Sequence, residues 1–155
     1  MSIVYPLVKA IVKALQEYGP VKSSDVMPVK EVTQELSSYS LAAGGSVDKD
    51  IGSITDRTAI IVTVKASFNA SATAGVRLYW LYSPDGTNFD DETSAEAEGN
   101  YADIGYDKDK NFVGAGKTMQ KTVIIPYVTP YIRLRLKNLD SSYAVTVDMW
   151  RTLLK

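Results

Sequence analysis

The residue pattern with the clearest potential for chemistry is the stretch 107–111, DKDKN, which places an oxygen ligand at every second position. Calcium-binding loops begin in this way and supply about six to eight oxygens in total. Phe112 stands where an EF-hand loop needs its turn glycine, and Thr118 stands where it needs its glutamate. The calcium candidate therefore consists of Asp107, Asp109 and Asn111. The alternative is a solvated acidic loop that holds no metal.

The composition removes most of the side chains that catalyse reactions. The 155 residues include no histidine and no cysteine, which excludes imidazole general bases, thiol nucleophiles, disulfides and ordinary zinc sites. Half of the carboxylates crowd the polar stretch 85–109, where solvent would keep them ionised, whereas a glycosidase-type acid needs a dry cleft that raises its pKa. We therefore expect no enzymatic activity, no catalytic residue and no cofactor apart from the calcium candidate.

Binding surfaces are the remaining source of function. Arg133, Arg135 and Lys137 alternate along one strand pattern and could contact nucleic acid, water or the acidic stretch of a neighbouring copy. The balance of seventeen basic and eighteen acidic residues argues against a dedicated nucleic-acid binder. Trp150 falls on the polar side of the last predicted strand. It could meet solvent, pack against a helix or another subunit, or offer a platform for a sugar ring.

The stretch 3–18 carries the convincing helical pattern of the chain. Its apolar residues form two neighbouring rows, Ile3, Leu7, Ile11 and Leu15, and Val4, Val8 and Val12. Gly19 and Pro20 then predict the end of the helix. The helix could cap the domain's own core, lie across a neighbouring copy or dock on a different partner, and it lacks the Trp and Phe of a membrane anchor. The partner-binding candidates are Ile3, Leu7, Ile11, Leu15, Arg133, Arg135 and Trp150.

In the rest of the chain, apolar and polar residues alternate as they do in β-strands. Strands are predicted within 28–41, 47–54, 58–68, 76–83, 119–125 and 131–137, and a last strand begins near Val145. Trp80 shares a face with apolar neighbours and is predicted to lie in the core. The turn 83–86, SPDG, predicts a hairpin, and 85–109 is predicted largely as a long loop. The pattern predicts a mainly β fold, an antiparallel, jelly-roll-like β-sandwich over 28–155, after an N-terminal amphipathic helix and linker, 1–27.

Three segments resemble known β-sandwich proteins. The stretch 82–91, YSPDGTNFDD, resembles a hairpin shared by discoidin-type, galactose-binding-like sandwiches and by small β-sandwich proteins of tailed phages and proviruses. The stretches 128–150, VTPYIRLRLKNLDSSYAVTVDMW, and 47–67, VDKDIGSITDRTAIIVTVKAS, are similar to their closing and opening strands. The resemblance implies a virion component of the capsid-decoration, head–tail or tail type. The chain lacks the terminal cysteines of the discoidin group and adds a helix.

The sequence thus predicts a non-enzymatic structural protein of a virion or virus-like assembly. Its expected partners are further copies of itself and other assembly proteins, and neither nucleic acid nor a membrane is expected. The alternative is a carbohydrate-binding β-sandwich module, for which a glycan would be the partner. The first residues do not follow a signal-peptide pattern, and the sequence contains no run of about 18 apolar residues that would span a bilayer. The resemblance implies that the protein is located in the virion.

Overall fold

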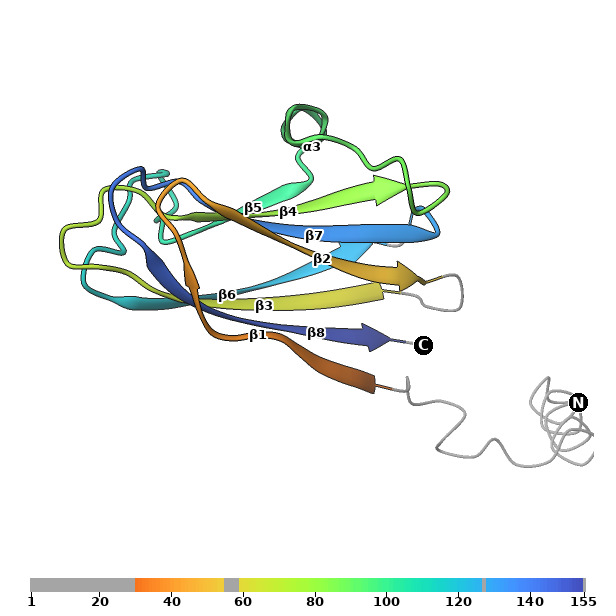
Figure 1. Cartoon of the computed structure of the whole chain (residues 1–155), viewed down its shortest axis with the longest axis horizontal. Coiled ribbons are helices and arrows are strands. Elements are labelled where there is room, and N and C mark those ends of the chain that lie inside the picture. The colour runs from red at the N-terminus through yellow and green to blue at the C-terminus, as the bar shows by residue number, and fades with distance from the viewer. Residues whose placement is uncertain (1–29, 55–58, 127, 155) are drawn as a thin grey trace, which may run out of the picture.

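The computed structural model describes residues 30–54, 59–126 and 128–154, which form two four-stranded sheets packed face to face (Figure 1). The strands are β1 (Lys30–Leu41), β2 (Ser46–Ser53), β3 (Ala59–Ser67), β4 (Val76–Ser83), β5 (Tyr101–Ile104), β6 (Thr118–Pro126), β7 (Tyr131–Asn138) and β8 (Val145–Leu154). A short helix, α3 (Glu92–Glu98), connects β4 to β5. The strand orders are β1-β8-β3-β6, called the 1-8-3-6 sheet, and β2-β7-β4-β5, called the 2-7-4-5 sheet.

The strand pairs are nested along the chain. All neighbouring strands are antiparallel, and β1 pairs with β8, β2 with β7, β3 with β6 and β4 with β5. Such nesting arises when one long antiparallel ribbon rolls over on itself, and it gives the eight-stranded jelly roll with its two Greek keys. The prediction of a mainly β, antiparallel architecture is therefore confirmed for the described residues.

The main core lies between the sheets because each strand points alternate side chains inward. The inward residues of the two most regular strands are Ile60, Val62, Val64 and Ala66 on β3 and Ile132, Leu134 and Leu136 on β7, and each is at most 1% exposed. Burial of a side chain of this size contributes about 1.5–3 kcal/mol to stability. A slip of one residue would turn all of them outward, so the core also fixes which side chains lie on the outer faces.

Two buried polar residues hold the loops at one end of the sandwich. The Asp140 carboxylate accepts hydrogen bonds from the backbone N–H of Thr73 at 2.6 Å and from those of Ser142 and Tyr143 at 2.8 Å. These donors, that of Thr73 foremost, hold the pKa of Asp140 well below its usual range. Asn138 Nδ2 donates to the Tyr143 carbonyl oxygen. The turn between β7 and β8 is thereby fixed to the loop before β4.

The stretch 85–109, predicted largely as a long loop, contains the helix α3 and the strand β5, and β5 pairs with β4 only after this helix. The chain turns at Gly86, whose φ of 75° favours glycine, and then passes through α3 before β5 returns beside β4. Asp91 starts α3 by accepting a hydrogen bond from the Ser94 N–H, and Gly99, with φ 75°, ends it. The predicted turn at 83–86 is present, and the Asp90 N–H donates to the Tyr82 carbonyl oxygen at 2.9 Å. The prediction that 85–109 is largely a loop misses α3 and β5.

Residues 1–29 lie outside the described part of the chain. The predicted helix over 3–18 and the division into 1–27 and 28–155 therefore stay predictions. Within the described ranges, no helix is long and apolar enough to cross a membrane.

Candidate interaction face

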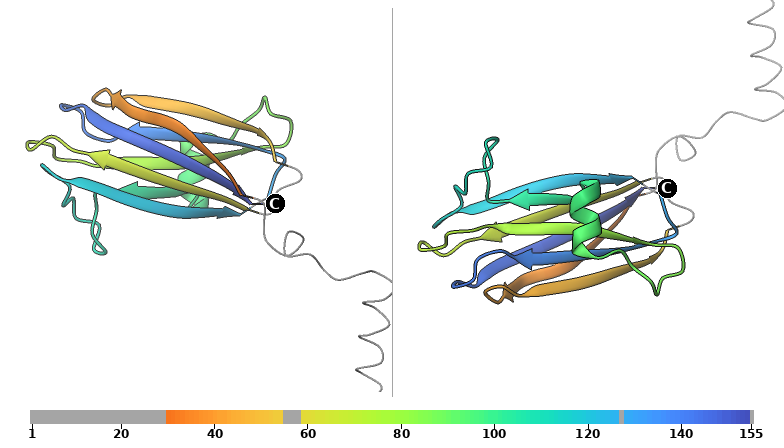
Figure 2. Two further views of the ribbon diagram at one scale, coloured as in Figure 1. Left: turned by 90° about the horizontal axis from the view of Figure 1, so that it is seen from below. Right: turned by 90° about the horizontal axis from the view of Figure 1, so that it is seen from above.

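The two sheets differ in what lies over their outer faces. Helix α3 crosses the outer face of the 2-7-4-5 sheet, whereas no described element crosses that of the 1-8-3-6 sheet (Figure 2). Antiparallel register places partner residues side by side on one face. Val32, Thr152, Ile61 and Ile124 form one outer row across the four strands of the 1-8-3-6 sheet. Gln34, Trp150, Thr63 and Thr122 form the next row.

Large apolar side chains gather at one end of this open face. We define the apolar outer patch as Val32, Ala59, Ile61, Ile124, Trp150 and Leu154. Val32 and Ile124 are 64% and 70% exposed, the two highest values among the large apolar residues that the structure describes. The other members are half-buried. Contiguous exposed apolar patches are typical of protein–protein contact sites, so this face is suited to binding a partner.

The opposite end of the same face is polar. It carries Lys65, Ser67, Thr118, Gln120 and Asp148. The Ser67 and Thr118 hydroxyls share a hydrogen bond of 2.8 Å, and those of Thr63 and Thr122, at the border of the patch, share one of 2.9 Å. The exposed apolar surface of this face is therefore confined to the patch end.

The predicted basic row of Arg133, Arg135 and Lys137 lies on the outer face of the 2-7-4-5 sheet. Its ion pairs join Arg133 to Asp50 at 2.5 Å, Arg135 to Asp48 at 2.7 Å and Lys137 to Glu92 at 2.5 Å. Arg133 also lowers the pKa of the Asp50 carboxyl through its hydrogen bond. The row is thus neutralised by β2 and α3 of the same chain. Contact of Arg133 and Arg135 with a partner stays a prediction.

Arg77 ties α3 to the sheet beneath it. Its Nε donates to Asp103 on β5 at 2.5 Å, and its Nη1 donates to Glu96 on α3 at 2.7 Å. Its guanidinium carbon lies 4.3 Å from the centre of the Tyr101 ring, within the range of a cation–π contact. The hydrogen bond to Asp103, foremost, raises the pKa of Arg77 above its usual range. One side chain therefore joins β4, β5 and α3.

A small second apolar cluster lies under α3. Ala95 of the helix packs against Tyr79 and Leu81 of β4, and all three are 1% exposed. The Tyr79 hydroxyl donates to Glu96 at 2.6 Å. Burial, together with the neighbouring Glu96, raises the pKa of Tyr79 to about 12. Apolar packing and paired charges of the same chain thus cover the outer face of the 2-7-4-5 sheet, which we call the closed face.

The calcium candidate lies in an exposed turn after β5. Asp107 Oδ1 accepts hydrogen bonds from the backbone N–H groups of Asp109 and Asn111, both at 2.9 Å. These bonds, that of Asn111 foremost, lower the pKa of Asp107. In the part of the chain that the structure describes, no three acidic residues are grouped so that they could hold a metal ion. The turn is stabilised by its own donors, and calcium binding stays a prediction.

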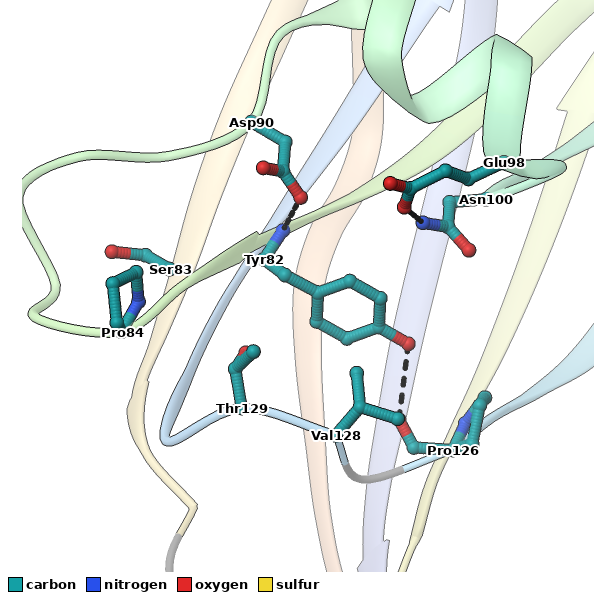
Figure 3. A pocket seen from close by; sticks show the side chains of 9 residues that line it. All are labelled: Tyr82, Ser83, Pro84, Asp90, Glu98, Asn100, Pro126, Val128 and Thr129. Carbon is teal, nitrogen blue, oxygen red and sulfur yellow. Dashed lines mark hydrogen bonds between the residues drawn. The ribbon is translucent and has the colours of Figure 1, made fainter.

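A cleft of about 480 Å³ opens near the ends of β4 and β6, and Tyr82 lies at its centre (Figure 3). Asp90, Glu98 and Asn100 also line it. The Tyr82 hydroxyl donates to the Pro126 carbonyl oxygen at 3.1 Å, and Asn100 Nδ2 donates to Glu98 at 2.8 Å. An aromatic ring beside carboxylates and an amide is the chemistry that sugar-binding sites use. In this cleft, the Tyr82 hydroxyl and the Asn100 amide already donate hydrogen bonds to other residues that line it.

The tryptophans occupy different environments. Trp80 packs against the main core as predicted but keeps partial exposure, and its buried Nε1 has no hydrogen-bond partner among the described residues. Trp150 lies on the open face between Gln34 and Thr63. Sequence analysis therefore places Trp150 on the correct side of its strand, and its binding role stays a prediction. Ile3, Leu7, Ile11 and Leu15 lie outside the described residues.

Sequence analysis missed the residues that make the open face apolar, chiefly Ile61 and Ile124. The sequence does contain a signal for these two residues, because each belongs to a pair of adjacent isoleucines, 60–61 and 124–125. In an alternating strand, two adjacent apolar residues point to opposite faces. One of each pair must therefore lie outside the core.

These features define the chain as an antiparallel β-sandwich with one open outer face. No protein-family model and no curated protein matches it. Among solved structures, it is similar to the PBSX exported protein XepA, with 15% identity, a TM-score of 0.44 and coverage of 81% of this chain and 36% of that one. It is also similar to dimeric latent PorU from Porphyromonas gingivalis, with 13% identity, a TM-score of 0.47 and coverage of 83% of this chain and 13% of that one. The chain spans well under half of either protein, and likeness at this level does not extend to function.

Proposed function

We propose that this protein is a non-enzymatic structural component of a virion or virus-like assembly, of the capsid-decoration, head–tail or tail type, which acts through protein–protein contacts. The observation that carries the proposal is the apolar outer patch, with Val32 and Ile124 64% and 70% exposed on a face that no described element covers. Association with a partner would remove this surface from water, which is the main favourable term in most protein–protein association.

Two further observations support the structural role. The chain has no histidine or cysteine, and the carboxylates on the closed face, Asp48, Asp50, Glu92, Glu96 and Asp103, are paired with arginine or lysine. General acid–base catalysis needs a carboxyl group that can exchange a proton with a substrate, whereas these carboxylates are held by cations of the same chain. The assignment to a virion rests on the sequence resemblance of 82–91 and 128–150, and eight-stranded jelly rolls are common in viral capsid proteins.

Self-association of the 155-residue chain tests the proposal. Mass photometry and sedimentation velocity should show oligomers that grow with protein concentration in the wild type and dissociate in Ile124→Glu. Gln120→Glu is the matched control, because it adds the same charge to the same strand and face but at the polar end. A chain that stays monomeric at every concentration and fails to decorate phage-type particles in electron micrographs would rule the proposal out.

Saccharide binding is the second candidate, and the cleft around Tyr82, Asp90, Glu98 and Asn100 favours it. Lectin domains also use the jelly roll. A glycan array with the purified chain measures this activity directly. Binding that is lost in Asn100→Ala would place the sugar in the cleft, and binding lost in Trp150→Ala would place it on the open face. A flat array would remove the candidate.

A further inference from the structure

The apolar outer patch lies at the end of the 1-8-3-6 sheet where the described chain begins. Lys30, the first residue of β1, is in register with Leu154 near the end of β8, and Leu154 pairs with Ala59 at the start of β3. Val32 of the patch follows two residues later on β1. The described chain therefore begins at the border of the patch.

The sequence pattern of residues 3–18 predicts an apolar helix face long enough to cover the patch. As a helix, the 16 residues of Ile3–Tyr18 would be about 24 Å long and about 10 Å wide. The patch spans three strand spacings, about 14 Å, and four residue steps of β8, about 13 Å. The apolar rows of the segment therefore suffice to cross all four strands. Lys9, Lys13 and Glu17 lie largely outside these rows and would stay in water when the rows are buried.

The connection between the segment and β1 favours docking on a different copy. Its eleven residues, 19–29, reach at most about 36–40 Å, which is long enough to bridge to a neighbouring sandwich. β1 begins at Lys30 and runs along the patch through Val32, so docking on the patch of the same chain would need a chain reversal over β1. A neighbouring sandwich at this end meets the segment without a chain reversal.

We propose that the segment Ile3–Tyr18 of one copy docks with its apolar rows on the apolar outer patch of a second copy. This inference rests on the proposed function, because it names the partner of the same face. Each copy carries one segment and one patch, so exchange between copies in a closed assembly fills every patch.

Cysteine cross-linking tests the proposal directly, because the chain contains no cysteine of its own. Ile11→Cys in one batch of the 155-residue chain and Thr152→Cys in an isotope-labelled batch should form a mixed disulfide dimer after mild oxidation. Thr152 lies in the central row of the patch, so its replacement leaves the apolar members intact. The control replaces Thr152→Cys with Thr93→Cys, on the exposed side of α3. Equal yields with both partners would overturn the proposal.

The same two cysteines placed in one chain distinguish docking on a second copy from docking on the segment's own patch. Oxidation of the double variant Ile11→Cys/Thr152→Cys should link chains to one another. A disulfide that forms within the monomer at all concentrations would show that the segment covers its own patch, and the proposal would fall.

Variants that place a charge in the segment or in the patch distinguish a failure of this inference from a failure of the proposed function. Leu7→Glu in the segment and Ile124→Glu in the patch should each weaken self-association at least about tenfold. Their controls, Gln16→Glu and Gln120→Glu, add the same charge outside the apolar rows and outside the patch and should leave it unchanged. If Ile124→Glu dissociates the oligomer and Leu7→Glu does not, the face is a contact site for a different surface, and only this inference fails. If neither variant dissociates it, self-association uses another surface, so this inference fails and the apolar outer patch no longer supports the proposed function.

Discussion

The two outer faces of the sandwich differ in whether their charged and apolar side chains are paired or covered within the chain. On the 2-7-4-5 sheet, every cation of the row Arg133, Arg135 and Lys137 has an acidic partner within the chain, and α3 covers an apolar cluster. On the 1-8-3-6 sheet, Ile61 and Ile124 occupy outer positions where a solvated sheet carries polar residues. The first face is complete within one chain. The second leaves apolar side chains exposed to water, and the proposed function is assigned to this face.

The closed face should depend most on Arg77, because its side chain and that of Asp103 are only 21% and 19% exposed. Arg77→Met keeps the aliphatic stem but leaves Asp103 and Glu96 without their cation, and we expect a loss of about 2–3 kcal/mol in the free energy of unfolding. Urea unfolding measures it. The control is Lys108→Met, whose partner Asp109 lies 3.8 Å away in an exposed pair, and this change should stay within about 0.5 kcal/mol. Equal losses in both variants would mean that the closed face is not held by Arg77.

The hydroxyl of Tyr79 should give the closed face a pH dependence. Burial raises the pKa of Tyr79 to about 12, above the usual value of about 10, so the folded chain keeps a proton that the unfolded chain releases. The stability from this group is present below pH 10 and is lost as the pH rises from about 10 to about 12, by about 3 kcal/mol. Urea unfolding at several pH values should show this decline in the wild type and a flatter profile in Tyr79→Phe. Parallel profiles would assign the decline to other groups.

Sequence analysis locates the core strands because their alternation is strict. Ile132, Leu134 and Leu136 face the core in β7, and the outward Arg133 and Arg135 follow from the same period. Helix α3 has seven residues and buries only Ala95, so it shows no helical period, and its signals are the caps Asp91 and Gly99 alone. A pattern based on period cannot find an element of this length.

The difference between the faces could not be predicted from the sequence. The acids Asp48 and Asp50 lie on β2, far in the chain from Arg135 and Arg133, and only the register of β2 with β7 brings them together. Alternation shows that one isoleucine of the pair 60–61 faces outward, but it does not show whether another element covers that face. That depends on the crossing of α3 over the other sheet, which is a property of the three-dimensional fold.

Glu92 should make a smaller contribution to the closed face. It accepts charge-assisted bonds from Lys137 and Arg135 and lies in the first turn of α3, where a carboxylate favours the helix. Glu92→Gln should lower the free energy of unfolding by about 1 kcal/mol, and the loss should shrink in 1 M salt, roughly the concentration at which such pairs are screened. Glu98→Gln, at the opposite end of the same helix, is the control and should be neutral or slightly stabilising. A loss that does not depend on salt would argue for packing in place of charge.

The open face should show the smallest effect on the isolated chain and the clearest effect of protein concentration. Ile124 is 70% exposed, and Thr keeps the β-branch that strands favour, so Ile124→Thr should change intrinsic stability by less than about 0.5 kcal/mol. Association stabilises the folded state by mass action, so the melting temperature of the wild type should rise with protein concentration. Scanning calorimetry should show that Ile124→Thr loses this rise while Gln120→Thr, on the same strand and face, keeps it. If all three chains show the same dependence, self-association uses another surface, and the two faces differ in composition without differing in function.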